Sequence, residues 1–531
     1  MPVGVLFRVS CALAAFLVPL LLYLDTLAPT VLTYDSGMLQ TKAYTLGIGH
    51  PTGYPTFILL GKLFTYLPFG DVAYRVNLSS AVYAALASLF VCLAARRLLS
   101  GGRHAPNSAL AAAASALAAV SFAVGPSLWS QAVVAEVYTL NALLVAATLH
   151  ALLVWRETGS KKRLYLASFL AGLAMTAHMT SGLLLPTTLV FVRLARPGTL
   201  KSGAARVRMA AAFLAGLSPY LYLPLRAAMD PVMNYGDAST FLGFFDLISG
   251  GPYKGQMLAF GPSELPGRLF MYGDLLAGQF SPLLLAAAVV GVWAFLRADR
   301  AALALLGVFG LGSLAYALEY DIHDIAVYFV PSYLVVALLL AVGLHSLTTG
   351  AGALLERFSP RARYATPLIL VPAILALALV VPETHRAVDQ SENLVTRRLV
   401  EVVVEETEPG ATVYGGRALS ALYYVQLVEG RRPDLRLASA YSARTIAEDL
   451  DPFVGKIGKR EGRKEEGKGE KDDMGADGAY LIMQEEQPPR AEDVTYYLEP
   501  WATDYEEDLK GYGYGLETIE ENLYRVSPSA R

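Results

Sequence analysis

Long apolar runs alternate with short polar segments from residue 6 to residue 382. A helix that crosses a bilayer needs about 20 mostly apolar residues. The pattern therefore predicts eleven such helices, at 6–26, 77–97, 108–124, 137–155, 164–178, 181–195, 208–226, 276–296, 301–318, 327–347 and 365–382. The 164–195 stretch also fits one long tilted helix. The first run is longer than the apolar part of a typical signal peptide, so we expect a retained helix.

Basic residues gather in alternate loops between these runs, and this pattern predicts the orientation. Lys and Arg favour cytoplasmic loops, and with eleven helices all five basic clusters fall on one side. A single helix over 164–195 would place the later clusters on the other side, which favours two helices. The N-terminus is then expected inside, with the loops 27–76 and 227–275 and the C-terminal region outside. The clusters are Arg96, Arg97 and Arg103; Arg156, Lys161, Lys162 and Arg163; Arg193, Arg196, Lys201, Arg206 and Arg208; Arg297 and Arg300; Arg357, Arg361 and Arg363.

The pattern changes after Pro382, where strand-like ATVYGG and AYLIMQ and helix-like ALSALYYVQLVEG replace the long apolar runs. This predicts a membrane domain over 1–382 and a small soluble α/β domain over 383–531. The stretch 454–478 has alternating charges and many glycines that cannot bury a core, so we expect a disordered surface loop there. The predicted fold class is a polytopic α-helical membrane protein, with about 11 transmembrane helices and a small α/β extracytoplasmic C-terminal domain.

Composition supports a membrane protein. Of the 531 residues, 54% are hydrophobic and 17% are charged, whereas soluble proteins carry about 25% charged residues. A net charge of -3 gives no argument for a nucleic-acid partner. Cys11 and Cys92 both lie in apolar segments and read as small buried hydrophobes, so they indicate neither a metal site nor a disulfide framework.

The stretch from Tyr34 to Pro55 is too polar and too rich in Gly and Pro to cross a bilayer. Asp35 is its candidate catalytic acid, although Asp-Ser-Gly is also good turn chemistry. Lys42, His50 and Tyr54 are candidate substrate-binding residues, and Lys42 and His50 could meet a phosphate. A solvated loop face, or a rigid loop that only holds the fold, explains them equally well.

A second group of polar residues lies at helix ends. Glu136, in SLWSQAVVAEVYTLN, is a second candidate catalytic residue, although an acid at a helix N-terminus is favourable to the helix dipole in any case. His178, between two short apolar segments, is a candidate binding residue, but a lone histidine there is more often structural. Arg226 lies against the positive-inside trend and is suited to a lipid-linked phosphate; snorkelling to headgroups is the alternative.

Two further loops carry candidate chemistry. The 227–275 loop is rich in aromatic residues and glycine, which suggests an amphipathic interfacial element with Tyr235, Tyr253 and Lys254 near the site. The stretch EYDIHDIAVYFVPSYL groups Glu319, Asp321, His323 and Asp324, which could bind a divalent metal. Their spacing matches no specific metal signature, and a solvated acidic loop is favoured.

Motifs for other enzyme classes are missing from the sequence. It contains no P-loop, no GxGxxG after a strand, no HExxH and no GxSxG in a credible context. The polar candidates at 35–55, 136, 226 and 319–324 are all expected on one membrane face, which indicates a single external cavity. A transporter would place such groups at mid-membrane depth, often within two similar halves.

Several blocks together resemble a known family. The stretch YDSGMLQTKAYTLGIGHPTGYPTFILLGKLFTYLPFGDVAYRVNLSSAVYAALA is similar to the N-terminal region of the protein O-mannosyltransferase-like membrane family, related to the GT-C glycosyltransferases. Supporting blocks follow in the family's order, so that the resemblance covers about residues 25 to 440. They are WSQAVVAEVYTLN, GLAMTAHMTSG, LYLPLRA followed by NYGD, DIHDIAVYFVPSYL and ALYYVQLVEGRRPDL.

The resemblance implies a membrane transferase that takes a sugar from a polyprenyl-phosphate donor on the external or lumenal face. An acid in the first external loop of such enzymes acts as a base or positions the acceptor, and Asp35 matches it. Family members often carry a glutamate three residues later, where this chain has Met38. This departure puts a two-acid motif in doubt and makes Glu136 a more interesting partner.

The predicted function is therefore transfer of a hexose, such as mannose, to a protein hydroxyl. The enzyme would be embedded in a prokaryotic cell membrane or the endoplasmic reticulum, in contact with membrane lipids. Asp35 would take the proton of the acceptor hydroxyl, and Arg226 would stabilise the leaving phosphate. A transferase acting on a glycolipid or cell-wall glycan, and a non-catalytic transporter, remain alternatives.

Overall fold

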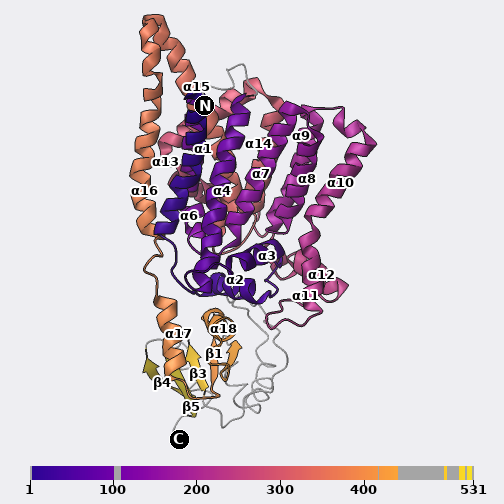
Figure 1. Cartoon of the computed structure of the whole chain (residues 1–531), viewed down its shortest axis with the longest axis vertical. Helices are drawn as coiled ribbons and strands as arrows, with labels where there is room; N and C mark the ends of the chain where they lie inside the picture. Colours follow the sequence, from indigo (N-terminus) through magenta and orange to yellow (C-terminus); the bar gives the residue numbers. More distant parts are fainter. Residues whose placement is uncertain are drawn as a thin grey trace.

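The computed structural model describes residues 3–100, 109–416, 418–439, 495–498, 514–520 and 523–528. Long helices form a bundle, and a smaller unit with strands lies beyond one end of it (Figure 1). The long helices are α1 (Val3–Asp25), α4 (Val72–Ser100), α5 (Ala109–Ala123), α7 (Val137–Thr158), α8 (Lys161–Met175), α9 (Leu184–Ala195), α10 (Gly203–Gly216), α13 (Leu265–Ala298), α14 (Arg300–Leu318), α15 (Val330–Phe358) and α16 (Val371–Val388).

Shorter helices connect these elements. They are the α-helices α2 (Tyr34–Thr45), α3 (Pro55–Phe64), α6 (Pro126–Ala132), α11 (Tyr222–Ala227) and α12 (Phe241–Ile248), and the 3-10 helices η1 (Met179–Leu183), η2 (Thr199–Lys201), η3 (Ser218–Leu221), η4 (Gly251–Gln256), η5 (Ile325–Phe329) and η6 (Pro360–Leu370). Four of the five short α-helices, α2, α3, α11 and α12, lie at the end of the bundle nearest the C-terminal unit (Figure 1).

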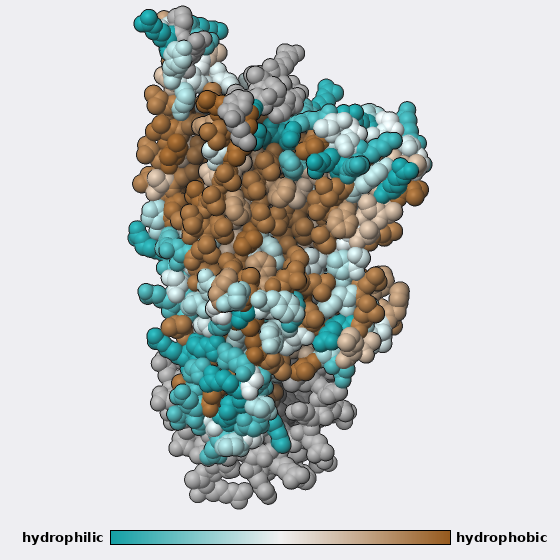
Figure 2. All heavy atoms as spheres, in the orientation of Figure 1, coloured by the Kyte–Doolittle hydropathy of each residue, from teal (hydrophilic) through white to brown (hydrophobic). Residues whose placement is uncertain are grey.

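The bundle is built for a membrane. Within the described residues, seven helical segments are long and apolar enough to cross a bilayer, or eight if the bent pair α5 and α6 counts as one. On the face drawn in Figure 2, a wide apolar band crosses the bundle, with polar residues gathered toward its two ends. Large apolar side chains are exposed on the long helices, among them Leu21 of α1, Val289 of α13 and Leu379 of α16. Lipid is the solvent that such a surface requires, so this is an integral multi-pass membrane protein.

Each of the eleven predicted spans has a helix at its place, but one prediction needs correction. The span expected at 208–226 is interrupted, because α10 ends at Gly216 and is followed by η3 and α11. Pro219 lacks the backbone N–H that a continuing α-helix needs. Gly216 also lies against α8, where an added Cβ would collide with the carbonyl oxygen of Phe169. The total number of spans remains a prediction.

Close helix packing in the bundle depends on small residues. α13 and α15 cross at Gly291 and Gly343, and a Cβ at either position would overlap the backbone of the other helix. Gly172 on α8 makes the same kind of contact with α10. Small residues let helices approach closely in lipid, where apolar burial gives no driving force between helices.

The C-terminal unit contains α17 (Val395–Glu406), α18 (Leu419–Leu427) and a five-stranded sheet of order β2-β1-β3-β5-β4. The strands are β1 (Thr412–Gly415), β2 (Arg436–Ser439), β3 (Thr495–Leu498), β4 (Tyr514–Glu520) and β5 (Leu523–Pro528). β1 pairs in parallel with β2 and β3, whereas β5 pairs antiparallel with β3 and β4. β1 and α18 lie within two of the predicted segments; AYLIMQ and the 454–478 insert lie outside the described residues.

Both loop regions that were expected outside lie at one end of the bundle, next to the C-terminal unit, and the N-terminus lies at the other end (Figure 1). α16 runs to Val388, past the predicted domain boundary at residue 382. At the end of the bundle where the N-terminus lies, an ion pair between Arg156 and Asp299 joins α7 to the start of α14. The arrangement fits the predicted grouping of loops, while the membrane side that each end faces stays a prediction.

Candidate functional site

α2 begins with the candidate acid. Thr33 is its N-cap residue and Asp35 lies in its first turn. The Asp35 side chain is 58% exposed, and its Oδ1 lies 3.7 Å from Nδ1 of His50. Most of the helix after Asp35 is buried, from Ser36 to Ala43. The carboxylate is therefore presented to solvent from a helix that is otherwise packed into the protein.

The 46–55 loop holds His50 next to Asp35. The N–H of Gly53 donates to the carbonyl of His50 at 2.6 Å, and the Tyr54 hydroxyl donates to the carbonyl of Pro51 at 3.0 Å. Gly53 has φ +83°, a conformation that glycine adopts without strain. The rings of His50 and Tyr54 are 4.9 Å apart, edge to face. Tight turns and the start of α3 at Pro55 thus fix the imidazole.

Glu136 caps a bundle helix at the same end. Its side chain accepts a hydrogen bond of 3.3 Å from the N–H of Val137 and so caps α7. Ser80 of α4 accepts from the Glu136 N–H at 3.1 Å and donates to its carbonyl at 3.3 Å. Burial, followed by the charges of Asp35 and Asp324, raises the pKa of Glu136 well above its usual value. Two acids from separate segments, Asp35 and Asp324, therefore lie within electrostatic reach of Glu136.

Aromatic rings connect these segments. The ring of His178 lies 6.3 Å from that of Tyr54, 5.3 Å from that of Tyr138 and 5.6 Å from that of Tyr328. Tyr320 lies 4.9 Å from Tyr328. His178 itself is buried, with Nδ1 2.8 Å from the hydroxyl of Thr180. The structure thus brings together His178 and Tyr54, which the sequence selected, with tyrosines at 320 and 328 that it did not.

Tyr54 has a buried phenol on which both Asp35 and Glu136 act electrostatically. Burial raises the pKa of its phenol well above the usual value, and Tyr253, Asp35, Glu136 and Tyr320 add to the effect in that order. Residues from four other places in the sequence consequently lie within electrostatic reach of one buried phenol. Among them is the 227–275 loop, which places Tyr253 within electrostatic reach.

Lys42 is the buried cation of the group. It is 2% exposed, and burial lowers its pKa to about 8, partly offset by the charge of Asp35. A charged side chain buried to this extent is costly unless it is paired, which suits a site that receives an anion.

Arg226 has a use that the sequence did not suggest. Its Nε donates to the carbonyl of Leu46 at 2.7 Å and its Nη2 donates to that of Thr45 at 3.1 Å. These carbonyls end α2, so the guanidinium satisfies backbone groups that the helix leaves without partners. A cation also complements the negative end of the helix dipole. The predicted contact with a lipid phosphate would have to share this side chain.

The acidic stretch 319–324 divides between two places. The main chain at Glu319 and Asp321 pairs with the 256–259 segment, through bonds of 3.0 Å to Ala259 N–H and Gln256 carbonyl. Asp324, in contrast, acts on Glu136. Within the described residues, no three His, Cys, Asp or Glu side chains are grouped so that they could hold a metal ion. A divalent metal therefore has no ligand set in this part of the chain.

The fold is shared with solved membrane enzymes. ArnT from Cupriavidus metallidurans, solved bound to undecaprenyl phosphate, superposes with a TM-score of 0.57 over 98% of this chain and 97% of its own, at 12% identity. The oligosaccharyltransferase AglB from Archaeoglobus fulgidus, solved with an inhibitory peptide and a dolichol-phosphate, gives a TM-score of 0.54 over 98% of this chain and 74% of its own, at 11% identity. The architecture is that of the polytopic GT-C glycosyltransferases.

Comparison with known sequences shows which family within this class the chain resembles. Residues 35–201 match the family model for the protein O-mannosyl-transferase TMEM260 N-terminal domain. Mouse protein O-mannosyl-transferase TMEM260 is 29% identical over 433 residues, which cover 76% of this chain and 58% of the mouse protein. The Dictyostelium discoideum protein of the same name is 25% identical over 306 residues, 54% of this chain and 36% of its own. These matches confirm the resemblance to the protein O-mannosyltransferase-like family, although the chain spans little more than half of the mouse relative.

Proposed function

We propose that this chain is an integral-membrane glycosyltransferase that moves a sugar, mannose, from a polyprenyl-phosphate donor to a protein hydroxyl on the external or lumenal face. The observation that carries the proposal is that Asp35, in the 27–76 loop, and Glu136, at the start of α7, both act electrostatically on the buried Tyr54, and that Asp35 also acts on Glu136. The names of the relatives support mannose and a protein acceptor. The neighbours bound to undecaprenyl phosphate and dolichol-phosphate support a lipid-linked donor.

Asp35 is the proposed general base. Its carboxylate is exposed and has His50 beside it, so an acceptor hydroxyl can approach it from solvent. As the acceptor oxygen attacks the anomeric carbon, the hydroxyl proton passes to the carboxylate. The bond between that carbon and the donor phosphate oxygen breaks, and the lipid phosphate leaves with the bonding electrons.

Glu136 is proposed to act in its protonated form. Burial and the charges of two nearby acids raise the pKa of its carboxyl well above the usual value, which favours the protonated form, and a protonated carboxyl can donate a hydrogen bond. Two nearby acids whose surroundings differ in this way suit two different roles in one reaction. Glu136 would hold a sugar hydroxyl while Asp35 takes the acceptor proton.

Lys42 and Arg226 are proposed to receive the donor phosphate. The Lys42 side chain is 2% exposed, and charge-assisted bonds to phosphate are strong. Arg226 has Nε and Nη2 engaged with α2, whereas its Nη1 donates only to the sulfur of Met229, at 3.8 Å, among the residues that the structure describes. A phosphate held by both would lie beside the helix that carries Asp35. His178 and Tyr253 are proposed to contact the sugar.

Helix α12 is proposed to rest in the lipid headgroups. Phe241, Leu242 and Phe245 of this helix are exposed, and apolar residues gather on the outer surface at α11 and α12 (Figure 2). Lys254 pairs with Asp246 at 3.5 Å next to this face. An amphipathic helix with such a face binds at the membrane interface, where a polyprenyl tail would enter.

The test is a transfer assay with purified full-length protein, labelled polyprenyl-phosphate mannose and three acceptor types: Ser/Thr-containing polypeptides, glycolipids and glycans. We expect labelled mannose on polypeptide with the wild-type protein and none with Asp35→Asn. Transfer to glycolipid or glycan alone would overturn the protein acceptor. No transfer from any polyprenyl-linked sugar would overturn the enzyme, and full activity of the variant would remove Asp35 from catalysis.

A further inference from the structure

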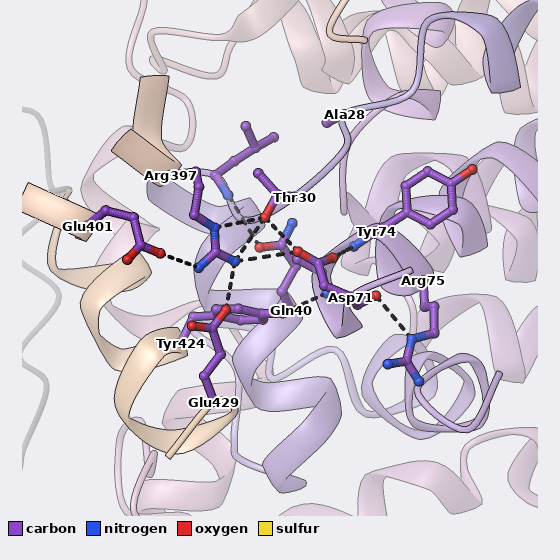
Figure 3. Close-up of polar contacts among 12 residues, drawn as sticks. Ala28, Thr30, Gln40, Asp71, Tyr74, Arg75, Arg397, Glu401, Tyr424 and Glu429 are labelled. Atoms are coloured by element: carbon purple, nitrogen blue, oxygen red, sulfur yellow. Dashed lines mark hydrogen bonds and ion pairs between the residues drawn. The ribbon is translucent and has the colours of Figure 1, made fainter. Parts of the chain in front are cut away.

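One arginine of the C-terminal unit reaches into the membrane domain. Arg397, on α17, donates from Nε and Nη2 to the hydroxyl oxygen of Thr30, at 3.1 and 2.9 Å. Its Nη2 also lies 3.4 Å from a carboxylate oxygen of Asp71 and 2.7 Å from one of Glu429. Its Nη1 lies 3.4 Å from Glu401 (Figure 3). The guanidinium thus bridges its own unit and the first loop.

The first-loop partners of Arg397 are tied to each other and to α4. The Thr30 hydroxyl donates to Asp71 at 2.6 Å. The other oxygen of Asp71 accepts from the N–H of Tyr74 at 2.7 Å, at the start of α4. Among the described residues, Arg397 makes the only ion pair of Asp71. Removal of the arginine would leave this half-buried carboxylate without a cation.

A chain of hydrogen bonds leads from Thr30 to the helix of Asp35. The Thr30 carbonyl accepts from Asn77 at 3.4 Å, and Asn77 accepts from Gln40 of α2 at 2.8 Å. Gln40 in turn accepts from the N–H of Leu32 at 3.4 Å. The backbone segment 30–32 that leads into α2 is therefore held at both of its ends, and Asp35 follows three residues later.

Helix α18 adds a direct contact with α2. A Cβ on Gly37, two residues after Asp35, would lie 2.8 Å from the hydroxyl oxygen of Ser420. The Tyr424 hydroxyl accepts from the N–H of Ala73 at 3.0 Å, and the Arg397 guanidinium lies 5.8 Å from the Tyr424 ring. Val31 and Ala73 share one apolar core with α17 and α18.

From these contacts we propose that Arg397 is a positioning residue, through which the C-terminal unit holds the 30–37 segment and hence the Asp35 carboxylate. The proposal rests on the proposed function, because it assigns Arg397 to the setting of the proposed base. Misplacement of a reacting group by about 1 Å costs about 100-fold in rate, so a contact of this kind has a measurable catalytic effect. Arg397 itself touches no substrate.

Arg431 provides a matched control. It pairs with Glu401 at 2.6 Å and with Glu429 at 3.4 Å, the same two glutamates that Arg397 contacts. Within the described residues, both of its ion-pair partners belong to the C-terminal unit. Arg397→Met and Arg431→Met therefore remove a cation from the same acidic pair, but only the first removes a contact with the first loop.

The experiment measures kcat, the donor KM and amide hydrogen exchange in full-length wild type and both variants. For Arg397→Met we expect kcat to fall about 10- to 100-fold with KM little changed, and amides of residues 34–45 to exchange faster. For Arg431→Met we expect faster exchange in α17 and α18 only, with kcat close to that of the wild type. Equal losses of kcat in both variants, with exchange at 34–45 unchanged, would overturn the proposal.

Two further variants cover poor folding of Arg397→Met. Arg397→Lys keeps the charge but cannot bond Thr30, Glu401 and Glu429 at once. Thr30→Val removes only the shared hydroxyl and keeps the shape. Either should lower kcat and speed exchange at 34–45; wild-type values in both would contradict the proposal. If the wild type transfers no sugar, the proposed function fails, while the exchange arms still report whether the C-terminal unit holds α2.

Discussion

Asp35 and Glu136 both lie at the N-terminal ends of helices at the same end of the bundle, yet their surroundings are opposite. Asp35 is 58% exposed and has a histidine 3.7 Å away. Glu136 forms a hydrogen bond with Ser80 through its N–H. Burial and the charges of two other acids raise the pKa of its carboxyl well above the usual value. The same chemical group at the same kind of helix position thus lies in solvent in one case and is largely withdrawn from it in the other.

The contrast indicates a division of labour. A base must be reachable by the acceptor, and the exposed side chain of Asp35 meets this condition. The raised pKa of Glu136 favours its protonated form, which can donate a hydrogen bond. The charge of Asp35 contributes to that raised pKa, so the two roles support each other.

The largest expected effect falls on the exposed acid. Asp35→Asn removes the base but keeps the size and the start of α2, and we expect kcat to fall about 10²- to 10⁴-fold with donor binding retained. Single-turnover assays and donor titration measure the two separately. Asp25→Asn is the control, since Asp25 ends α1 and pairs with His385 at 2.8 Å, outside the site. Similar losses in both variants would contradict the assignment.

Lys42→Met tests the buried cation beneath this acid. We expect the donor KM to rise about 10- to 100-fold, because a hydrogen bond to a charged group contributes about 1.5–3 kcal/mol. The same substitution should raise the stability of the protein at neutral pH, because it removes a buried charge. The native pKa of Lys42 is about 8 against 10.5 for an ordinary lysine, so the native state binds fewer protons between these values.

Stability of the wild type therefore rises with pH from about 8 to 10.5, and the full cost of the buried charge is present below pH 8. Lys42→Met should lose this dependence and unfold at a higher temperature than the wild type at neutral pH. Thermal unfolding across this pH range measures it. A variant that is both less stable and normal in donor KM would show that Lys42 serves the fold alone.

The sequence predicts the helices of the bundle well, because each membrane helix is specified by the apolar residues of its own segment. Long apolar runs have a helix at every predicted place, since lipid leaves the backbone no other partners. The break at Pro219 was also readable, because proline removes a helical hydrogen bond. The blocks at 35–55 and near 136, which resemble the protein O-mannosyltransferase-like family, contain Asp35 and Glu136 and so single them out in the sequence.

Contacts between distant segments could not be read in this way. Arg226 caps α2 across 180 and 181 residues of sequence, and Arg397 reaches Thr30 across 367. Neither contact produces a periodic pattern in the sequence, because the two residues that it joins lie on segments far apart along the chain. The acids at 319–324 were adjacent in sequence, but the backbone turn sends Asp324 toward Glu136 while Asp321 pairs through its main chain.

Glu136→Gln sharpens the contrast between the acids. An amide keeps a hydrogen-bond donor, so kcat should fall only about tenfold, near 1.4 kcal/mol in the barrier, and far less than in Asp35→Asn. The raised native pKa means that folded protein binds more protons than unfolded protein above about pH 4.5, so wild-type stability falls as pH rises. The variant should lack this fall, as thermal unfolding across pH will show. A loss as large as that of Asp35→Asn would mean that Glu136 works as a carboxylate.

The smallest effect is expected from the third acid. The charge of Asp324 helps to raise the pKa of Glu136, after burial and Asp35. Asp324→Asn should therefore lower that pKa and move the alkaline limb of kcat to lower pH, by less than about one unit because exposed charges are screened. Asp321→Asn is the matched control, since Asp321 is also exposed and does not act on Glu136. A pH profile that moves equally in both variants would trace the limb to general surface charge, whereas movement in Asp324→Asn alone would tie it to the buried carboxyl.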